Sequence, residues 1–256
     1  PNSIDLSFFK PFDAVIANDE LTQDKIEINK NYKLKVNDDL KCNNNNIKEK
    51  DYNNIIRILY MTRMTKRKGV DIFLEVLPVI CHFFKNVLFV ICGNGPKLEH
   101  IKNVVLRFGL SNQVEFHDFI SADQVPYLLS SNHIYLGTSI TESFCLSILE
   151  AVSCGTYVVA TEVGGVSEIL PKGAITLCEP NSKNISQSLI EVIRSEKFRH
   201  KKDYRGFIQK NYGVQSVTMR TINIYQDVIQ SYQNRSILSL LINSLLRYPG
   251  YILIIS

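Results

Sequence analysis

Glu142 and Glu150 are eight positions apart in the segment that follows the apolar strand expected at 133–136. A helix over 144–153 would separate the two carboxylates by about 2.2 turns and about 80° of rotation, at roughly 3.6 residues per turn. Glu142 would then border the start of the helix, where free backbone amides attract negative groups, and Glu150 would face that site from a lower turn. The spacing alone equally allows two solvated charges on a helix, and that alternative stays open.

Two cations follow the first expected strand, which covers 55–60. Arg63 offers a planar fork of donors and Lys68 a point charge, so the pair suits a diphosphate. A solvated basic loop is the alternative. Together with the amides at the start of the expected helix, the two cations would neutralise a pyrophosphate leaving group.

The carboxylates would serve the rest of the same ligand. Glu150 can accept hydrogen bonds from a ribose diol, as acidic residues do in nucleotide-binding folds, and Glu142 can accept them from sugar hydroxyls. The cations and the carboxylates together therefore describe a site for a nucleotide-diphosphate sugar.

Gly93 and Gly95 lie in a turn between an expected strand and an expected helix. The turn lacks the third glycine of a dinucleotide fingerprint because Leu98 occupies that place, and Pro96 rules out a P-loop. The two glycines therefore indicate only that the backbone approaches something closely, either a ligand or a neighbouring loop.

Strand and helix signals alternate from residue 55 onward. Apolar runs predict strands at 55–60, 87–92, 114–116, 133–136, 157–161 and 174–178. Helical spacing predicts helices at 71–84, 97–108, 123–129, 144–153, 166–170, 183–194, 198–210 and 215–232. This alternation predicts an α/β fold, a Rossmann-like parallel sheet with helices on both faces.

Ligands bind such sheets at the carboxyl ends of the strands. We therefore expect one rim to gather the loops at Arg63, 93–95, 117–118, 138–142 and 162–165.

The composition is that of an ordinary globular protein, with 45% hydrophobic and 21% charged residues among 256. Lys and Arg outnumber Asp and Glu by 29 to 25, an excess too small to indicate nucleic acid. A local basic cluster is formed by Lys197, Arg199, Lys201, Lys202 and Arg205. This cluster fits either an anionic membrane surface or a solvated helix face.

The six cysteines include no Cys-x-x-Cys pair, and four of them, Cys81, Cys92, Cys145 and Cys178, sit inside apolar runs. This pattern indicates buried free thiols in a reducing compartment. The five histidines show no metal-ligand spacing, so we predict no metal site.

Composition divides the chain into four segments. Residues 1–17 begin the domain, and 18–54, poor in apolar residues and rich in Asn, Lys and Asp, are predicted to be a disordered insertion. Residues 55–232 form the Rossmann-like domain. Residues 233–256 are apolar but interrupted, and their apolar pieces are shorter than the roughly 20 residues of a spanning helix. They are either membrane-associated or a packed C-terminal helix.

Residues 141–155, TESFCLSILEAVSCG, resemble the E-x7-E signature of retaining glycosyltransferases with two Rossmann-like domains, the GT-B type. Residues 62–69 resemble the basic donor-phosphate loop of that family, and 93–96 resemble its glycine turn. The runs 158–171 and 177–180 are similar to the branch of the family that begins glycosylphosphatidylinositol (GPI) anchor synthesis.

The resemblance covers 55–228 and also the first five residues, which resemble the hinge at the start of the second domain. It implies that the chain is the C-terminal, donor-binding half of a GT-B enzyme. It also implies roles for particular residues: Glu142 would be the catalytic, sugar-contacting carboxylate and Glu150 would bind the ribose. The remaining donor contacts would come from Arg63, Lys68, Gly93, Gly95 and the amides of Phe144, Cys145 and Leu146.

The implied reaction is the retaining transfer of N-acetylglucosamine from UDP to phosphatidylinositol, with no metal or other cofactor. The implied setting is a multisubunit transferase complex on the cytoplasmic face of the endoplasmic reticulum membrane. Asp118 departs from the pattern, because the family usually has glycine near the uracil. The insertion at 18–54 has no counterpart in the family, and the acceptor-binding N-terminal domain is absent, so we expect the chain to be a fragment.

Two other interpretations stay open. One is another GT-B glycosyltransferase that acts on a lipid or polysaccharide. The other is a non-catalytic nucleotide-sugar-binding module of a membrane complex.

Overall fold

The computed structural model describes residues 3–6, 9, 55–117, 120–200 and 202–233. Its strands are β1 (Ile56–Met61), β2 (Val87–Cys92), β3 (Val114–His117), β4 (Ile134–Gly137), β5 (Tyr157–Thr161) and β6 (Thr176–Cys178). Its α-helices are α3 (Val70–Phe83), α4 (Leu98–Arg107), α5 (Val125–Ser130), α6 (Leu146–Ser153), α7 (Ser182–Arg194), α8 (Arg205–Tyr212) and α9 (Val214–Gln233). Its 3-10 helices are η2 (Lys66–Lys68), η3 (Ser111–Gln113), η4 (Ala122–Gln124), η5 (Gly164–Glu168) and η6 (Lys197–Arg199).

The strands form one parallel sheet in the order β3-β2-β1-β4-β5-β6. This arrangement confirms the predicted Rossmann-like α/β fold. The order reverses at β1, which pairs with β2 on one side and with β4 on the other. Because all six strands run in the same direction, their carboxyl ends share one edge of the sheet. The reversal at the centre of that edge is where such folds bind ligands.

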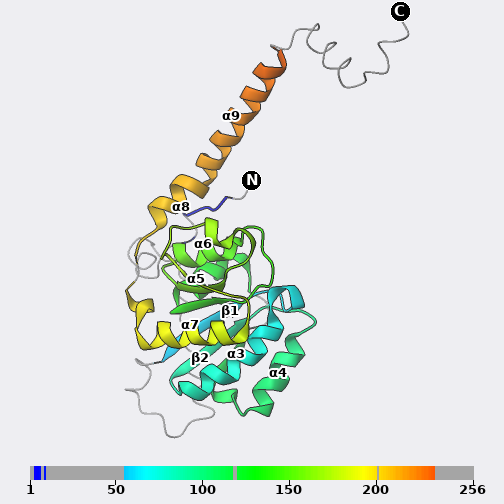
Figure 1. The fold of residues 1–256 in the computed structure, drawn as a ribbon, viewed down its shortest axis with the longest axis vertical. Coiled ribbons are helices and arrows are strands. Elements are labelled where there is room, and N and C mark those ends of the chain that lie inside the picture. The colour runs from blue at the N-terminus through cyan, green and yellow to red at the C-terminus, as the bar shows by residue number, and fades with distance from the viewer. Residues whose placement is uncertain (1–2, 7–8, 10–54, 118–119, 201, 234–256) are drawn as a thin grey trace, which may run out of the picture.

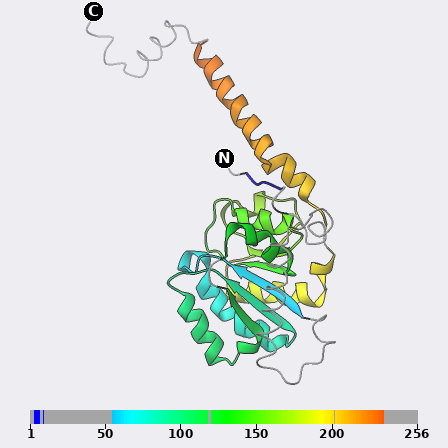
Figure 2. The ribbon, with the colours of Figure 1, turned by 180° about the vertical axis from the view of Figure 1, so that it is seen from behind.

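Helices cover both faces of the sheet (Figures 1 and 2). Alternate residues of a strand point to opposite faces, so Ile58 belongs to the buried cluster that includes residues of α3, α4 and α7, while its neighbour Leu59 belongs to the cluster that includes residues of α5, α6 and α8. Both side chains are fully buried, as expected for a central parallel strand. The two buried apolar clusters, one on each face of the sheet, support the strands from which the rim loops extend.

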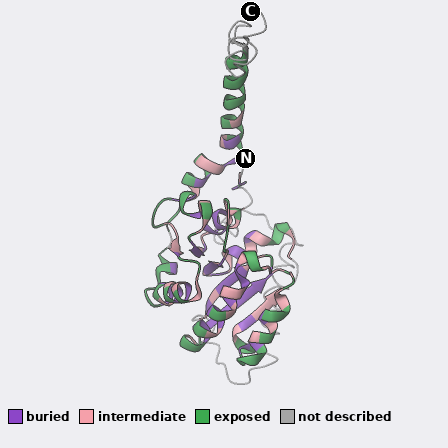
Figure 3. Cartoon of the chain, turned by 45° about the vertical axis from the view of Figure 1, so that its right-hand side comes forward, coloured by how far each residue is buried: buried purple, intermediate pink, exposed green. Residues whose placement is uncertain are grey.

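The N-terminal segment packs beside α8. The Ile4 amide donates to the Tyr212 carbonyl at 2.8 Å, and Ile4 forms a parallel bridge with Gly213. From that point α9 leads away from the body of the domain (Figure 1) and is exposed along most of its length (Figure 3). Within the described part of the chain, no helix has both the length and the apolar character needed to cross a membrane.

Two helix predictions need correction. The segment 198–210 is not one helix: η6 ends at Arg199, and α8 begins only at Arg205, where Asp203 Oδ1 accepts the Arg205 amide at 2.8 Å. The short helix predicted at 166–170 is instead the 3-10 helix η5, which begins earlier, at Gly164, and ends at Glu168. The predictions for 18–54, Asp118, Lys201 and 234–256 lie outside the described residues.

Candidate functional site

The loops after β1, β4 and β5 are joined into one assembly at the carboxyl edge of the sheet. Thr138, just after β4, is 1% exposed, and its Oγ1 donates to the carbonyls of Lys68 (3.0 Å) and Gly69 (3.1 Å). The Ile140 amide donates to the Arg67 carbonyl at 3.0 Å. These bonds confirm that the loops at 62–69 and 138–142 meet on one rim.

The loop after β5 closes against Glu142 through two glycines. Gly164 has φ +54°, and a Cβ on it would lie 1.7 Å from the Glu142 carbonyl oxygen. A Cβ on Gly165 would lie 2.4 Å from the Ser143 carbonyl oxygen. Only glycines allow this approach. The Gly-Gly pair therefore fixes the position of the backbone that carries Glu142.

Glu142 and Lys68 form an ion pair with each other. Lys68 Nζ donates to Glu142 Oε1, and Ser139 Oγ donates to the same oxygen at 2.9 Å. The Glu142 side chain is 12% exposed and the Lys68 side chain is 26% exposed, so the pair is largely shielded yet open on one side. The sequence assigned the two residues to different parts of a ligand and did not predict their contact.

Helix α6 starts two residues later than predicted, at Leu146. Cys145 is its N-cap and has a left-handed conformation, with φ 58° and ψ 69°. Glu142 therefore lies on a loop before the helix, and the predicted rotation of about 80° from Glu142 to Glu150 does not apply.

The start of α6 nonetheless offers backbone donors. Among the described residues, the amides of Phe144, Cys145, Leu146 and Ser147 have no carbonyl acceptor. These donors stand at the positive end of the helix dipole, close in sequence to the Glu142–Lys68 pair. An anion at this rim would satisfy them.

Glu150 is half-buried on α6, and burial raises the pKa of its carboxyl group. Its carboxylate has no hydrogen bond or ion pair with the described residues. One turn earlier, Ser147 Oγ lies 3.0 Å from the hydroxyl of Tyr135, which also donates to the Met61 carbonyl at 3.3 Å. Glu150 is thus a desolvated acceptor without a donor, as expected of a group that binds hydroxyls of a ligand.

Arg63 is exposed, and its guanidinium has no partner among the described residues. Its loop is nevertheless held in place, because the Met64 amide donates to the Asn94 carbonyl at 2.9 Å. A Cβ on Gly93 would lie 2.1 Å from the Thr62 carbonyl oxygen, and one on Gly95 would lie 2.6 Å from that of Met64. The sequence left open whether the backbone at these glycines approaches a ligand or a neighbouring loop, and the structure shows that it approaches a neighbouring loop. Their direct contact with a ligand stays a prediction.

His117 ends β3 at the same edge. Its Nε2 lies 2.5 Å from Glu115 Oε1, and Arg57 Nη2 lies 3.3 Å from Glu115 Oε2. Burial would raise the pKa of Glu115, but the hydrogen bond from His117 and the charge of Arg57 outweigh it, and the pKa is lowered. Glu115 therefore holds His117 in place as an anionic acceptor. Asp118 lies outside the described residues.

The structure also bears on the predictions for the cysteines and for a metal site. Cys81, Cys92, Cys154 and Cys178 are buried free thiols, whereas Cys145 is only half-buried. The prediction that Cys145 is buried was wrong, because its left-handed position at the start of α6 brings it toward the rim. Among the residues that the structure describes, no three His, Cys, Asp or Glu side chains are grouped to hold a metal ion.

Sequence reasoning missed Thr138, Ser139 and Ser147 as individual residues of the site. Thr138 and Ser139 connect the loops and hold Glu142, and Ser147 contributes a free amide beside Glu150. Their positions could have indicated these roles. Small hydroxyl residues just after a parallel strand, or in the first turn of a helix, form hydrogen bonds with loop backbone groups and bind anions.

The family model for the glycosyl transferases of group 1 matches residues 43–208 of this chain. A phosphatidylinositol N-acetylglucosaminyltransferase subunit from Arabidopsis thaliana is 35% identical over 191 residues, which are 75% of this chain and 42% of that protein. The chain thus spans less than half the length of this curated relative.

Two solved structures share the fold. The C-terminal domain of a group 1 glycosyl transferase from Francisella tularensis is 23% identical with a TM-score of 0.59, and the match covers 82% of this chain and 99% of that one. The Anabaena protein HepE, in complex with UDP and glucose, is 19% identical with a TM-score of 0.67, over 88% of this chain and 55% of that one.

Proposed function

The chain belongs to the glycosyl transferases of group 1, and from this premise we propose that it is the donor-binding half of an enzyme that transfers N-acetylglucosamine from UDP to phosphatidylinositol, the first step of GPI-anchor synthesis. The observation that carries the proposal is the Lys68–Glu142 ion pair, which lies beside unsatisfied amides at the start of α6. The name of the Arabidopsis relative supports the sugar and the acceptor.

The diphosphate would lie between the loop after β1 and the start of α6. Arg63 and Lys68 would supply positive charge, and the amides of Phe144, Cys145 and Leu146 would supply fixed donors. When the bond between the sugar and the diphosphate breaks, negative charge develops on the departing phosphate oxygen. Donors that are already in place stabilise that charge without reorganisation, and this accelerates the reaction.

The two carboxylates would bind opposite ends of the donor. Glu150, a desolvated acceptor on α6, would accept from the ribose hydroxyls. Glu142 would face the sugar, and its bond from Ser139 would hold the carboxylate in place once Lys68 has turned to the phosphates. Lys68 would thus exchange one anion, Glu142, for another, the diphosphate.

The proposed reaction needs no metal or other cofactor, because the cations and amides of the rim neutralise the leaving group. The proposed setting is the cytoplasmic face of the endoplasmic reticulum membrane, in a complex with other transferase subunits and beside the lipid acceptor. The subunit designation in the name of the Arabidopsis relative supports a complex.

Two alternatives use the same rim. Another GT-B glycosyltransferase acting on a lipid or polysaccharide would keep every donor contact and differ in the acceptor. A non-catalytic module would bind the nucleotide sugar and transfer nothing.

Calorimetry with UDP tests the donor site on this chain. Lys68→Ala should weaken UDP binding about tenfold, because a charge-assisted contact to phosphate contributes about 1.5 kcal/mol. Lys102→Ala is the matched control, since Lys102 pairs with Glu99 on α4 and is not among the residues proposed to bind the donor. Equal UDP affinity in the two variants would remove the phosphate role from Lys68.

The acceptor is tested with the full gene product in membranes. Radiolabelled UDP-N-acetylglucosamine should label phosphatidylinositol. Label in another lipid or in a polysaccharide would favour the first alternative, and donor binding without any transfer would favour the second.

A further inference from the structure

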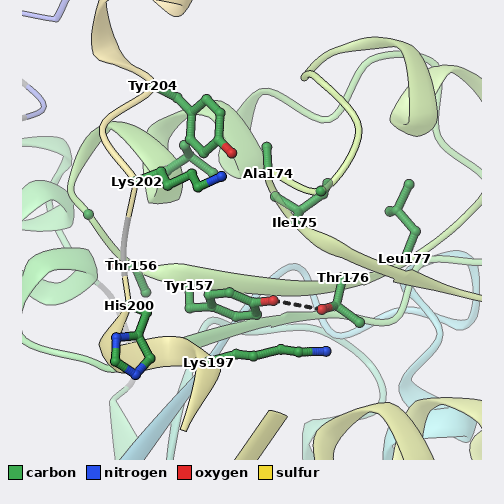
Figure 4. Close-up of a pocket in the computed structure, with 13 residues that line it drawn as sticks. Thr156, Tyr157, Ala174, Ile175, Thr176, Leu177, Lys197, His200, Lys202 and Tyr204 are labelled. Carbon is green, nitrogen blue, oxygen red and sulfur yellow. Dashed lines mark hydrogen bonds between the residues drawn. The ribbon is translucent and has the colours of Figure 1, made fainter. Parts of the chain in front are cut away.

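A cavity of about 530 Å³ lies at the opposite edge of the sheet from the rim. It is bordered by the turn that leads into β5, by the loop that leads into β6, and by the connection between α7 and α8. Figure 4 shows side chains from these three segments around one space. This volume suits a small molecule.

The charged groups around the cavity are all basic. Lys197, His200 and Lys202 line it, and none of its thirteen lining residues is an Asp or Glu. Lys197 Nζ is already paired with Glu191 Oε1 at 2.6 Å, outside the lining. The side chains of His200 and Lys202 have no partner among the described residues.

The 3-10 helix η6, which carries Lys197 and directly precedes His200, is held against the core. Phe198, between Lys197 and His200, is 0% exposed, and its ring packs edge-on against the His133 ring with 5.6 Å between the ring centroids. This anchor fixes η6 on the core. In Figure 4 the Lys202 ammonium and the Tyr204 hydroxyl point toward the same part of the cavity, above Tyr157 and Thr176.

The remaining wall is apolar. Ala174, Ile175 and Leu177 line the cavity and are only partly buried against the core of this face. The Tyr157 hydroxyl and Thr176 Oγ1 form a hydrogen bond with each other at 2.9 Å. The aromatic ring of Tyr157 therefore contributes an apolar surface to the cavity wall. Apolar walls beside the unpaired Lys202 ammonium favour a ligand that has both an anionic and an apolar part.

We infer that this cavity is a second ligand site, which binds a phosphate-bearing molecule with its phosphate near the Lys202 ammonium and the Tyr204 hydroxyl and its apolar part against Ile175 and Leu177. The ligand is either a soluble phosphate ester or the headgroup region of an anionic lipid. The site is separate from the rim and does not depend on the proposed function.

Fluorescence titration with 1-naphthyl phosphate tests the site, because the chain has no tryptophan to obscure the naphthyl emission. The probe should bind and 1-naphthol, which lacks the phosphate, should not. Lys202→Ala should weaken binding about tenfold, as expected for a lost charge-assisted contact, and Tyr204→Phe, which removes a neutral hydroxyl, should weaken it less. Lys210→Ala, an exposed lysine on α8 that does not line the cavity, should leave the affinity unchanged.

Saturating UDP should not displace the probe, which separates this site from the rim. A second arm uses phosphatidylcholine vesicles with and without one-fifth phosphatidic acid. Probe binding alone identifies a soluble ester, and vesicle binding that Lys202→Ala weakens identifies a lipid headgroup. Equal affinities for Lys202→Ala and Lys210→Ala, displacement by UDP, tight binding of 1-naphthol, or no binding in either arm would each overturn the inference.

Discussion

Replacing Glu142 by Gln should tighten the binding of UDP even though it removes a residue of the proposed site. In the free protein Lys68 is committed to the Glu142 carboxylate, and the diphosphate must compete for it. Gln keeps the size of the side chain and can still accept from Ser139, but it carries no charge. Lys68 would then be available to the diphosphate, and a nearby negative charge would be gone.

The structure sets the magnitude. Two unit charges in contact near a protein surface attract each other by about 4 kcal/mol at an effective dielectric constant of about 20. The side chains of Glu142 and Lys68 are 12% and 26% exposed, so desolvation and screening cancel much of this attraction. A net value on the order of 1 kcal/mol remains. Releasing Lys68 should therefore tighten UDP binding by about fivefold.

The assay is calorimetry with UDP and with UDP-N-acetylglucosamine at low salt. Glu142→Gln should gain affinity for UDP but lose the extra affinity that the sugar provides. Glu162→Gln is the matched control, because Glu162 is an exposed carboxylate just after β5 on the same edge. Weaker UDP binding in Glu142→Gln, or an equal gain in Glu162→Gln, would falsify the exchange of Lys68 between the two anions.

Two further substitutions probe the same rim. Burial raises the folded-state pKa of Glu150 above its unfolded value, so the ionised carboxylate costs stability as pH rises. Glu150→Gln should therefore raise Tm at pH 8, lose that gain near about pH 4, and weaken UDP binding. An unchanged Tm at pH 8 would contradict the desolvation argument. Gly164→Ala should lower the free energy of unfolding by about 3 kcal/mol in urea, because its Cβ would meet the Glu142 carbonyl at 1.7 Å. Gly109→Ala, at φ +64° with open space around it, should lose only about 1 kcal/mol, and equal losses would show that the contact with Glu142 adds nothing.

The sheet could be predicted from the sequence because its strands are buried on both faces. The run at 87–92 is apolar at every position, and the structure buries all six residues of β2. Turn residues between such runs then locate the carboxyl edge. The prediction is less accurate at the edge of the sheet, where β6 was expected from Ala174 but begins at Thr176 and pairs with β5 alone.

The site was predicted as a set of residues but not as a geometry. Cys145 adopts a left-handed conformation, which its residue type does not signal, and the start of α6 was misplaced as a result. The contact between Lys68 and Glu142 joins residues 74 positions apart, and local patterns carry no information on such pairs. The sequence showed a close approach at Gly93 and Gly95, but only the structure shows that the partner is the Arg63 loop.

The central position of β1 also has a consequence for synthesis on the ribosome. The Arg57 amide donates to His133 Nδ1 at 3.0 Å, although the two residues are 76 positions apart. At about 5–20 residues per second, roughly 4 to 15 s pass between their translation. During that interval the fully buried Ile58 and Leu59 belong to a strand whose second edge has no partner. Until β4 emerges, the nascent chain therefore presents an apolar strand edge that could pair with another chain.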